Sequence, residues 1–214
     1  MHSLYRFHGR ERDLNQLLLE IPSLDLGGTL EVHLANHALQ SGFQVTLYTY
    51  NLELFDPTWF HLSPSDFHTN LRRRQEKTRE RPSKFHEAID AYLQFLELGG
   101  CLRMRDLSPA LLAISLRAGL PVMAGLSATY LYQEPREIPA TNLPDDLSGD
   151  PAGHFVIISG YDPQHFRFTI ADPLQPNPFS SEPIYHIDAL RTMTALLLGT
   201  FTYDASLLIL EPYA

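Results

Sequence analysis

Two kinds of apolar pattern divide the chain, and their order constrains the fold more than any other feature. In the first half, apolar residues recur at helical spacing, whereas most of the short apolar or alternating segments lie in the second half. Helices that precede a group of strands are typical of α+β folds. The sequence therefore predicts an α+β fold in which N-terminal helices pack on an antiparallel sheet.

Start and stop signals place the individual elements. Helical patterns are expected in these segments: 1–8, 13–20, 27–40, 66–98 in two pieces divided at Pro82, 108–119 and 188–198. Strands are expected in these segments: 43–50, 121–132, 155–160, 166–171 and 205–210. No internal repeat and no linker divides the sequence, so a single domain over 1–214 is predicted.

The charge composition restricts the kinds of partner that the chain can bind. The formal net charge is −9, which argues against a nucleic-acid partner, because phosphate binding needs clustered Lys and Arg. One basic cluster exists, but Glu76 and Glu80 interrupt it, so it is interpreted as a solvated helix face. Its members are Arg72, Arg73, Arg74, Lys77, Arg79 and Arg81.

Three absences in the sequence favour a cytoplasmic protein. No apolar run is long enough for a membrane span, and the N-terminus lacks a signal-peptide core. The single cysteine, Cys101, excludes an internal disulfide framework. A cleaved leader would leave the same sequence, so that alternative stays open.

The most informative stretch sets a histidine and an aspartate across a hairpin. His154 opens the apolar strand 155–160, and Asp172 follows the return strand 166–171. If the hairpin turns symmetrically about Pro163, His154 lies directly opposite Asp172, with Cβ atoms about 4.5–5.5 Å apart. A register slip of one residue would place the two side chains on opposite faces.

A carboxylate beside an imidazole has two possible uses. It can fix the tautomer of the ring and stabilise the imidazolium, which is the role it has in hydrolase triads. It can also simply brace the end of a hairpin. The spacing of His154 and Asp172 leaves both interpretations open.

The motifs around these two residues resemble those of papain-like cysteine peptidases. Residues 153–162 (GHFVIISGYD) and 170–173 (IADP) are most similar to the family of bacteriocin-processing peptidases that cut after a double glycine, and to its stand-alone bacterial relatives. The resemblance implies a papain-like fold, a peptide or protein substrate, His154 as general base and Asp172 as the residue that orients it.

The nucleophile of that family is missing from the sequence. The family places a Cys-Gly-Pro-type turn at the start of a long helix, where the helix N-terminus lowers the pKa of the thiol, with an oxyanion glutamine upstream. The helix at 1–8 resembles the remainder of that helix, so the turn and the glutamine would lie before Met1. We expect a domain that lacks the nucleophile segment, unless the natural protein begins upstream.

Other candidate residues give weaker patterns. Cys101 follows two glycines rather than a helix start, and is interpreted as a small apolar residue. Ser127 lacks the Gly-x-Ser-x-Gly surroundings of a serine nucleophile. His33 and His37 have the spacing of a metal-ligand pair on a helix but no third ligand, so no metal and no cofactor are predicted.

Three hypotheses remain. The first is an inactive or peptide-binding member of the peptidase fold, and the second is an active thiol peptidase whose true N-terminus lies upstream of Met1. The third is a structural α+β protein in which the pair of His154 and Asp172 only braces a hairpin. The peptide and the oligomeric state are left open.

Overall fold

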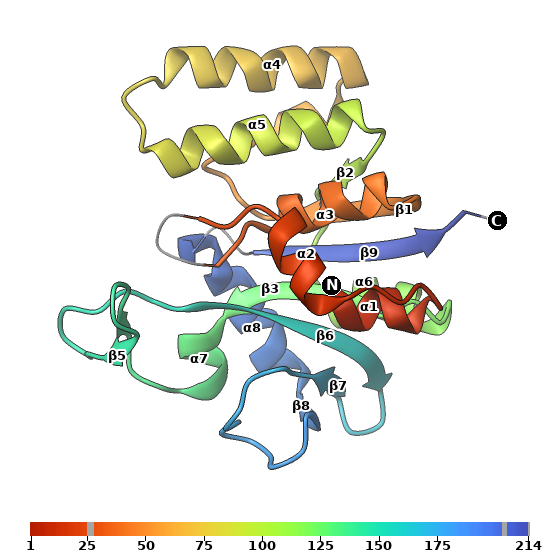
Figure 1. Cartoon of the computed structure of the whole chain (residues 1–214), viewed down its shortest axis with the longest axis vertical. Coiled ribbons are helices and arrows are strands. Elements are labelled where there is room, and N and C mark those ends of the chain that lie inside the picture. Colours follow the sequence, from red (N-terminus) through yellow and green to blue (C-terminus); the bar gives the residue numbers. More distant parts are fainter. Residues whose placement is uncertain (25–27, 203–204, 214) are drawn as a thin grey trace. The chain divides into compact units, whose positions relative to one another are not determined.

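The computed structural model (Figure 1) describes residues 1–24, 28–202 and 205–213. The chain divides into two compact units. Unit 1 comprises Met1–Met104 with Leu210–Ala214, and unit 2 comprises Arg105–Ile209. Helices and strands occur in both, so the structure is α+β, as predicted from the sequence. The papain-like fold and the single domain stay predictions.

Unit 1 contains most of the helical segments. Its elements are α1 (His2–Phe7), α2 (Leu14–Glu20), α3 (Glu31–Gln40), β1 (Phe43–Thr49), the short 3-10 helix η1 (Pro57–His61), α4 (Pro64–Lys77), α5 (Ser83–Glu97) and β2 (Cys101–Arg103). The helix that was expected to open at Gly27 begins at Glu31, and Gly27 itself lies outside the described residues.

The core of unit 1 forms around β1. Its alternate residues Phe43, Val45 and Leu47 are buried, as the alternating pattern predicts. Helix α3 packs against β1 and α5. The ring of Tyr5 on α1 stacks on Phe43 with 5.3 Å between centroids, which fixes α1 to this core. Helix α1 gives way to Gly9, whose φ of +69° is a conformation that glycine adopts without strain.

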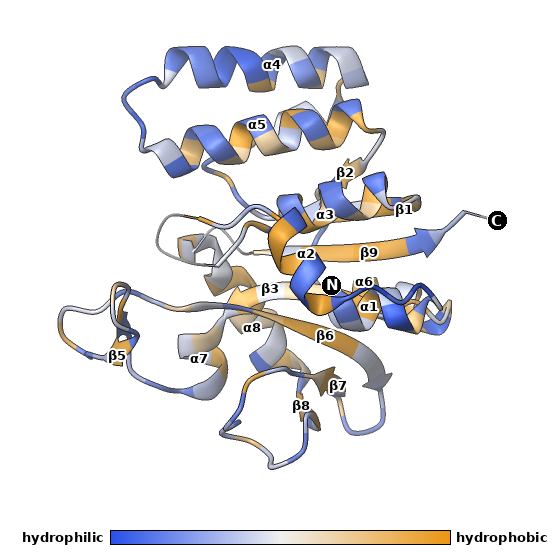
Figure 2. Ribbon diagram, in the orientation of Figure 1, coloured by the Kyte–Doolittle hydropathy of each residue, from blue (hydrophilic) through white to orange (hydrophobic). Residues whose placement is uncertain are grey.

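Helices α4 and α5 pack side by side between β1 and β2 along the chain (Figure 1). Pro82 separates them, as predicted. Helix α4 is mostly hydrophilic (Figure 2), and Arg72 in its basic cluster forms an ion pair with Glu97 at 3.0 Å. Because this long helical connection lets the chain return in the same direction, β1 and β2 pair in parallel. The prediction of an antiparallel sheet is therefore wrong for this pair.

Unit 2 contains the antiparallel strands. Its elements are α6 (Pro109–Arg117), β3 (Val122–Ser127), α7 (Ala128–Tyr132), β4 (Glu137–Ile138), β5 (Leu143–Pro144), β6 (Gly153–Asp162), β7 (Arg167–Ala171), β8 (Ile184–Asp188), α8 (Ala189–Leu198), η2 (Gly199–Thr202) and β9 (Ser206–Pro212), the last continuing into unit 1. The strands follow the order β9-β3-β6-β7-β8, and every neighbouring pair is antiparallel. Helices α6 and α8 pack against these strands.

Two local features of unit 2 differ from the prediction. The segment 121–132, expected as one strand, is β3 followed by α7, because Ser127 Oγ accepts a hydrogen bond from Tyr130 N and caps a helix there. Strand β8 was not expected, although its alternate residues Tyr185 and Ile187 are buried in the manner of a strand.

The register of the β6–β7 hairpin also differs from the prediction. The symmetric turn about Pro163 is wrong, because the side chain of Asp162 accepts hydrogen bonds from the backbone N–H groups of Gln164 and His165 and moves the turn toward the C-terminus. Together with a bulge after Ile158, this moves the strands by two residues, so that Ile158 pairs with Ile170. An even shift preserves the faces, so His154 and Asp172 become diagonal rather than direct neighbours.

None of the helices in the described ranges is both long enough and apolar enough to span a membrane.

Candidate functional site: a histidine and an aspartate at the end of a hairpin

His154 and Asp172 occupy the open end of the β6–β7 hairpin in unit 2. His154 is the second residue of β6 and pairs with Leu126 of β3. Asp172 directly follows β7, and its backbone N–H donates to the carbonyl of Pro183 at 2.8 Å. The side chain of His154 is 21% exposed and that of Asp172 is fully buried. The imidazole is thus the part of the pair that solvent can reach.

A hydrogen bond joins the two side chains. Nε2 of His154 lies 2.8 Å from Oδ1 of Asp172. Diagonal neighbours in an antiparallel pair are roughly 7–8 Å apart at their backbones, which is within reach of a histidine side chain. The structure therefore brings these two residues together by a register that differs from the one expected.

Asp172 is the centre of a larger hydrogen-bond network. Besides His154, the backbone N–H of Leu174 donates to Oδ1 at 3.0 Å. Three side chains donate to Oδ2: Tyr132 at 2.5 Å, Tyr185 at 2.6 Å and Asn177 at 3.0 Å. These donors come from α7, β8 and the loop that follows Asp172. The carboxylate is surrounded by donors on both oxygens.

This network keeps the carboxylate ionised. Burial alone would raise the pKa of Asp172, but the hydrogen bonds from the imidazole and the two phenols outweigh it and hold that pKa well below its usual range. An ionised carboxylate can only accept hydrogen bonds, so His154 must donate its Nε2–H. In the neutral ring, the lone pair then resides on Nδ1.

The hydrogen bond to Asp172 leaves the Nδ1 atom of His154 as the other ring nitrogen to account for. It forms no hydrogen bond to any part of the chain that the structure describes. A neutral imidazole with one nitrogen held by a carboxylate and the other free can take a proton from a nearby group. This geometry is compatible with proton transfer at Nδ1 and with a purely structural pair.

Sequence patterns did not point to Tyr132, Tyr185 or Asn177 as part of this site. Tyr132 was placed in a strand that is in fact α7, and Tyr185 lies in the strand that was not expected. The alternation of residues 184–188 was the one available signal for β8. No pattern in the sequence relates any of these three residues to Asp172.

Neither candidate nucleophile accompanies His154 in unit 2. Ser127 pairs with Gly153 while Leu126 pairs with His154, so the serine side chain points to the opposite face of the strands. Its Oγ is also occupied by the hydrogen bond from Tyr130 N, at 3.3 Å. Cys101 belongs to unit 1, where its sulfur accepts a hydrogen bond from Arg103 Nε at 3.1 Å.

His33 and His37 bind different partners in unit 1. Nε2 of His33 lies 3.3 Å from Glu87 Oε1, and Nε2 of His37 lies 2.9 Å from Glu20 Oε2. The hydroxyl of Tyr5 lies 2.6 Å from Nδ1 of His37. In the described part of the chain, no group of three or more His, Cys, Asp or Glu residues is arranged to hold a metal ion.

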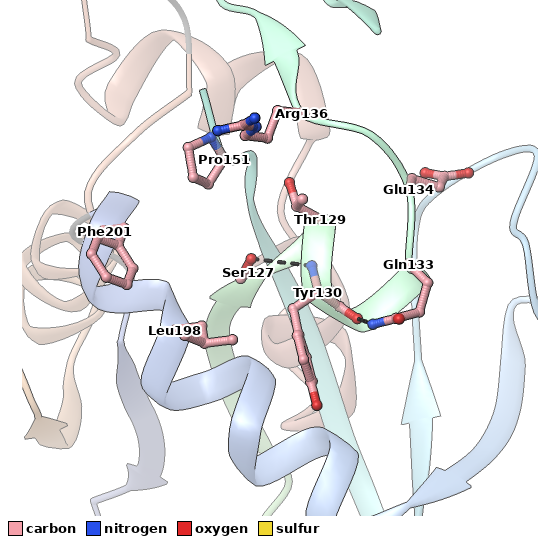
Figure 3. A pocket seen from close by; sticks show the side chains of 9 residues that line it. All are labelled: Ser127, Thr129, Tyr130, Gln133, Glu134, Arg136, Pro151, Leu198 and Phe201. Carbon is pink, nitrogen blue, oxygen red and sulfur yellow. Dashed lines mark hydrogen bonds between the residues drawn. The ribbon is translucent and has the colours of Figure 1, made fainter. Parts of the chain in front are cut away.

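A separate open pocket of about 430 Å³ lies in unit 2 (Figure 3). Tyr130, Leu198 and Phe201 supply its apolar surface, and Glu134 and Arg136 supply charged groups. Neither His154 nor Asp172 lines it.

No protein-family model, no curated protein and no solved structure matches the chain.

Proposed function

We propose that the chain is a cysteine-peptidase-like domain that keeps the general base of a thiol peptidase and, as it stands, binds a peptide without cutting it. The observation that carries the proposal is the hydrogen bond of 2.8 Å between His154 Nε2 and Asp172 Oδ1, which leaves Nδ1 free on a partly exposed ring. This is the arrangement in which a carboxylate orients an imidazole and stabilises its protonated form. The motifs around both residues support the same function.

The absence of a thiol beside this base favours binding over cleavage. Unit 2 contains no cysteine, and Ser127 faces away from His154. Without a thiolate to generate, the imidazole has no nucleophile to activate. The chain of residues 1–214 is therefore expected to show no peptidase turnover.

The alternative is an active thiol peptidase whose Cys-Gly-Pro turn precedes Met1 in the natural protein. The intact mass of the natively expressed protein separates the two. A mass equal to that of residues 1–214 excludes the longer enzyme, and a larger mass with a reactive thiol supports it.

A peptide titration tests the proposal directly. The probe is a synthetic peptide that ends in a double glycine, and the readout is the ¹³C-labelled ring signals of the histidines. We expect the His154 signals to shift on addition of the peptide while the peptide stays uncut. A scrambled peptide without the glycines is the control.

Two outcomes would count against the proposal. Cleavage of the peptide that is lost in His154→Ala would show an active enzyme. No response of His154 to the peptide would instead favour a structural role, in which Asp172→Asn changes stability and no binding event.

A further inference from the structure

Two buried phenols hold the carboxylate that orients His154. Tyr132 and Tyr185 are only 6% and 7% exposed, and their hydroxyls donate to the same oxygen of Asp172 at 2.5 and 2.6 Å. They reach it from different elements, α7 and β8. A phenylalanine would fill either position equally well, so packing alone does not explain the two hydroxyls.

These phenols stay protonated. Burial raises the pKa of Tyr132 and of Tyr185 above the ordinary value, and the hydrogen bond to the Asp172 carboxylate raises both further. Near neutral pH each hydroxyl is therefore protonated and donates to the carboxylate. Short hydrogen bonds to an ionised acceptor are among the strong ones.

Donation to Oδ2 spreads the negative charge of Asp172 away from Oδ1, the oxygen that faces His154. A carboxylate that shares its charge stabilises an imidazolium less than a bare one does. We propose that Tyr132 and Tyr185 are positioning residues that set how tightly His154 holds its proton, by sharing the charge of Asp172. The value of this setting for chemistry rests on the proposed function of His154.

The surroundings contain few other groups that could produce the same effect. Asn177 donates to Oδ2 at 3.0 Å, a longer bond from a neutral amide. The charged group on α8 is Arg191, whose guanidinium carbon lies 5.0 Å from the centre of the Phe179 ring. That ring packs against both tyrosine rings, at 5.6 and 5.4 Å between centroids. The guanidinium thus lies on Phe179 rather than on the carboxylate.

The experiment measures the titration midpoint of the His154 ring by NMR in the full chain, with ¹³C-labelled histidine and assignment by His154→Gln. In Tyr132→Phe and in Tyr185→Phe we expect the midpoint to rise relative to the wild type, because the carboxylate regains charge. Asn177→Ala should give a smaller rise. Tyr161→Phe is the matched control, since its hydroxyl forms no hydrogen bond to the described residues, and it should give none.

A second variant should move the titration midpoint of His154 in the opposite direction. Fluorotyrosine in place of Tyr132 keeps the shape of the ring but makes the hydroxyl a stronger donor, so the His154 midpoint should fall. The fluorotyrosine variant tests the inference if a phenylalanine variant does not fold. Midpoints that stay unchanged, or that move the same way in both arms, would overturn the inference.

Failure here and failure of the proposed function are distinguishable. The midpoint reports a proton on His154, whereas the peptide titration reports a ligand beside it. If the midpoint stays unchanged but the peptide binds, the role of the phenols is rejected and the proposed function stands. If the midpoint shifts but no peptide binds, the role of the phenols stands and the proposed peptide binding is rejected.

Discussion

Each unit contains a tyrosine, a histidine and a carboxylate in hydrogen-bond contact, but the order of the three differs. In unit 1 the histidine is central: Tyr5 OH contacts Nδ1 of His37, and Nε2 contacts Glu20. In unit 2 the carboxylate is central: Asp172 accepts from the phenols and from Nε2 of His154, whose Nδ1 is left free. The same residue types therefore form two different hydrogen-bond clusters, one centred on a histidine and one on a carboxylate.

The difference shows what makes a histidine available for chemistry. Burial raises the pKa of Tyr5, so its hydroxyl stays a donor and occupies the lone pair of His37. With its other nitrogen donating to Glu20, that ring has nothing to offer a ligand and ties three helices together. A neighbouring carboxylate is common to both clusters, so the free ring nitrogen of His154 is the distinguishing feature.

The largest effect is expected from removing the carboxylate of unit 2. Asp172→Ala leaves two buried phenols and further donors without an acceptor, and each buried unsatisfied group costs about 1–3 kcal/mol. The free energy of unfolding in urea near neutral pH should fall by more than about 3 kcal/mol. Asp162→Ala removes a carboxylate of the same hairpin that is 33% exposed, and it should cost less, because solvent can reach the donors that it leaves.

The pH dependence of this loss checks its origin. Because the folded-state pKa of Asp172 is lowered, its contribution to stability is present above the unfolded-state pKa of about 3.9 and is lost as pH falls through the folded-state value. The gap between wild type and Asp172→Ala should therefore narrow below about pH 4. A gap that widens in acid would contradict an ionised acceptor.

The next largest effect is expected at the central histidine of unit 1. His37→Leu removes the acceptor of Tyr5, which is 1% exposed, and should lower the free energy of unfolding by about 2 kcal/mol. Adding Tyr5→Phe removes a buried hydroxyl that would keep only the 3.5 Å contact with Ser41 Oγ, and it should recover part of that loss. If the two losses simply add, the hydrogen bond between the side chains contributes nothing.

A smaller effect is expected for the histidine of unit 2. In His154→Ala, the Asp172 carboxylate keeps its phenol, amide and backbone donors, so the free energy of unfolding should fall by less than about 1 kcal/mol. Equal losses in His154→Ala and His37→Leu would erase the contrast between the clusters. They would then favour the hypothesis that His154 only braces the hairpin.

Much of the fold could be predicted from local patterns. The alternation around β1, the capped start at Ser108 and the break at Pro82 each act within a few residues, and each is confirmed. The contact between His154 and Asp172 was also expected, but by a wrong register. The shift came from the Asp162 side chain and from a bulge, and the contact survived because an even shift keeps both residues on one face.

The rest of both clusters could not be predicted, because its members meet only through tertiary structure. Tyr132 and Tyr185 are separated by 53 positions in the sequence, yet their hydroxyls share one oxygen. His37 was considered with His33 as a helix-face pair, whereas its partners are on α1 and α2. The spacing of residues along one helix does not predict which residues of other helices contact them.

The smallest effect is expected at the exposed end of the unit 1 cluster. The hydrogen bond from His37 is the largest of several that lower the pKa of Glu20, but this carboxylate is open to solvent, so Glu20→Gln should change stability less than any variant above. The amide oxygen can still accept from Nε2–H. The lowered pKa means that any difference is present near neutral pH and disappears as the pH falls below about 4 in urea unfolding series. A loss comparable to that of His37→Leu would mean that the carboxylate, rather than the phenol, makes this histidine structural.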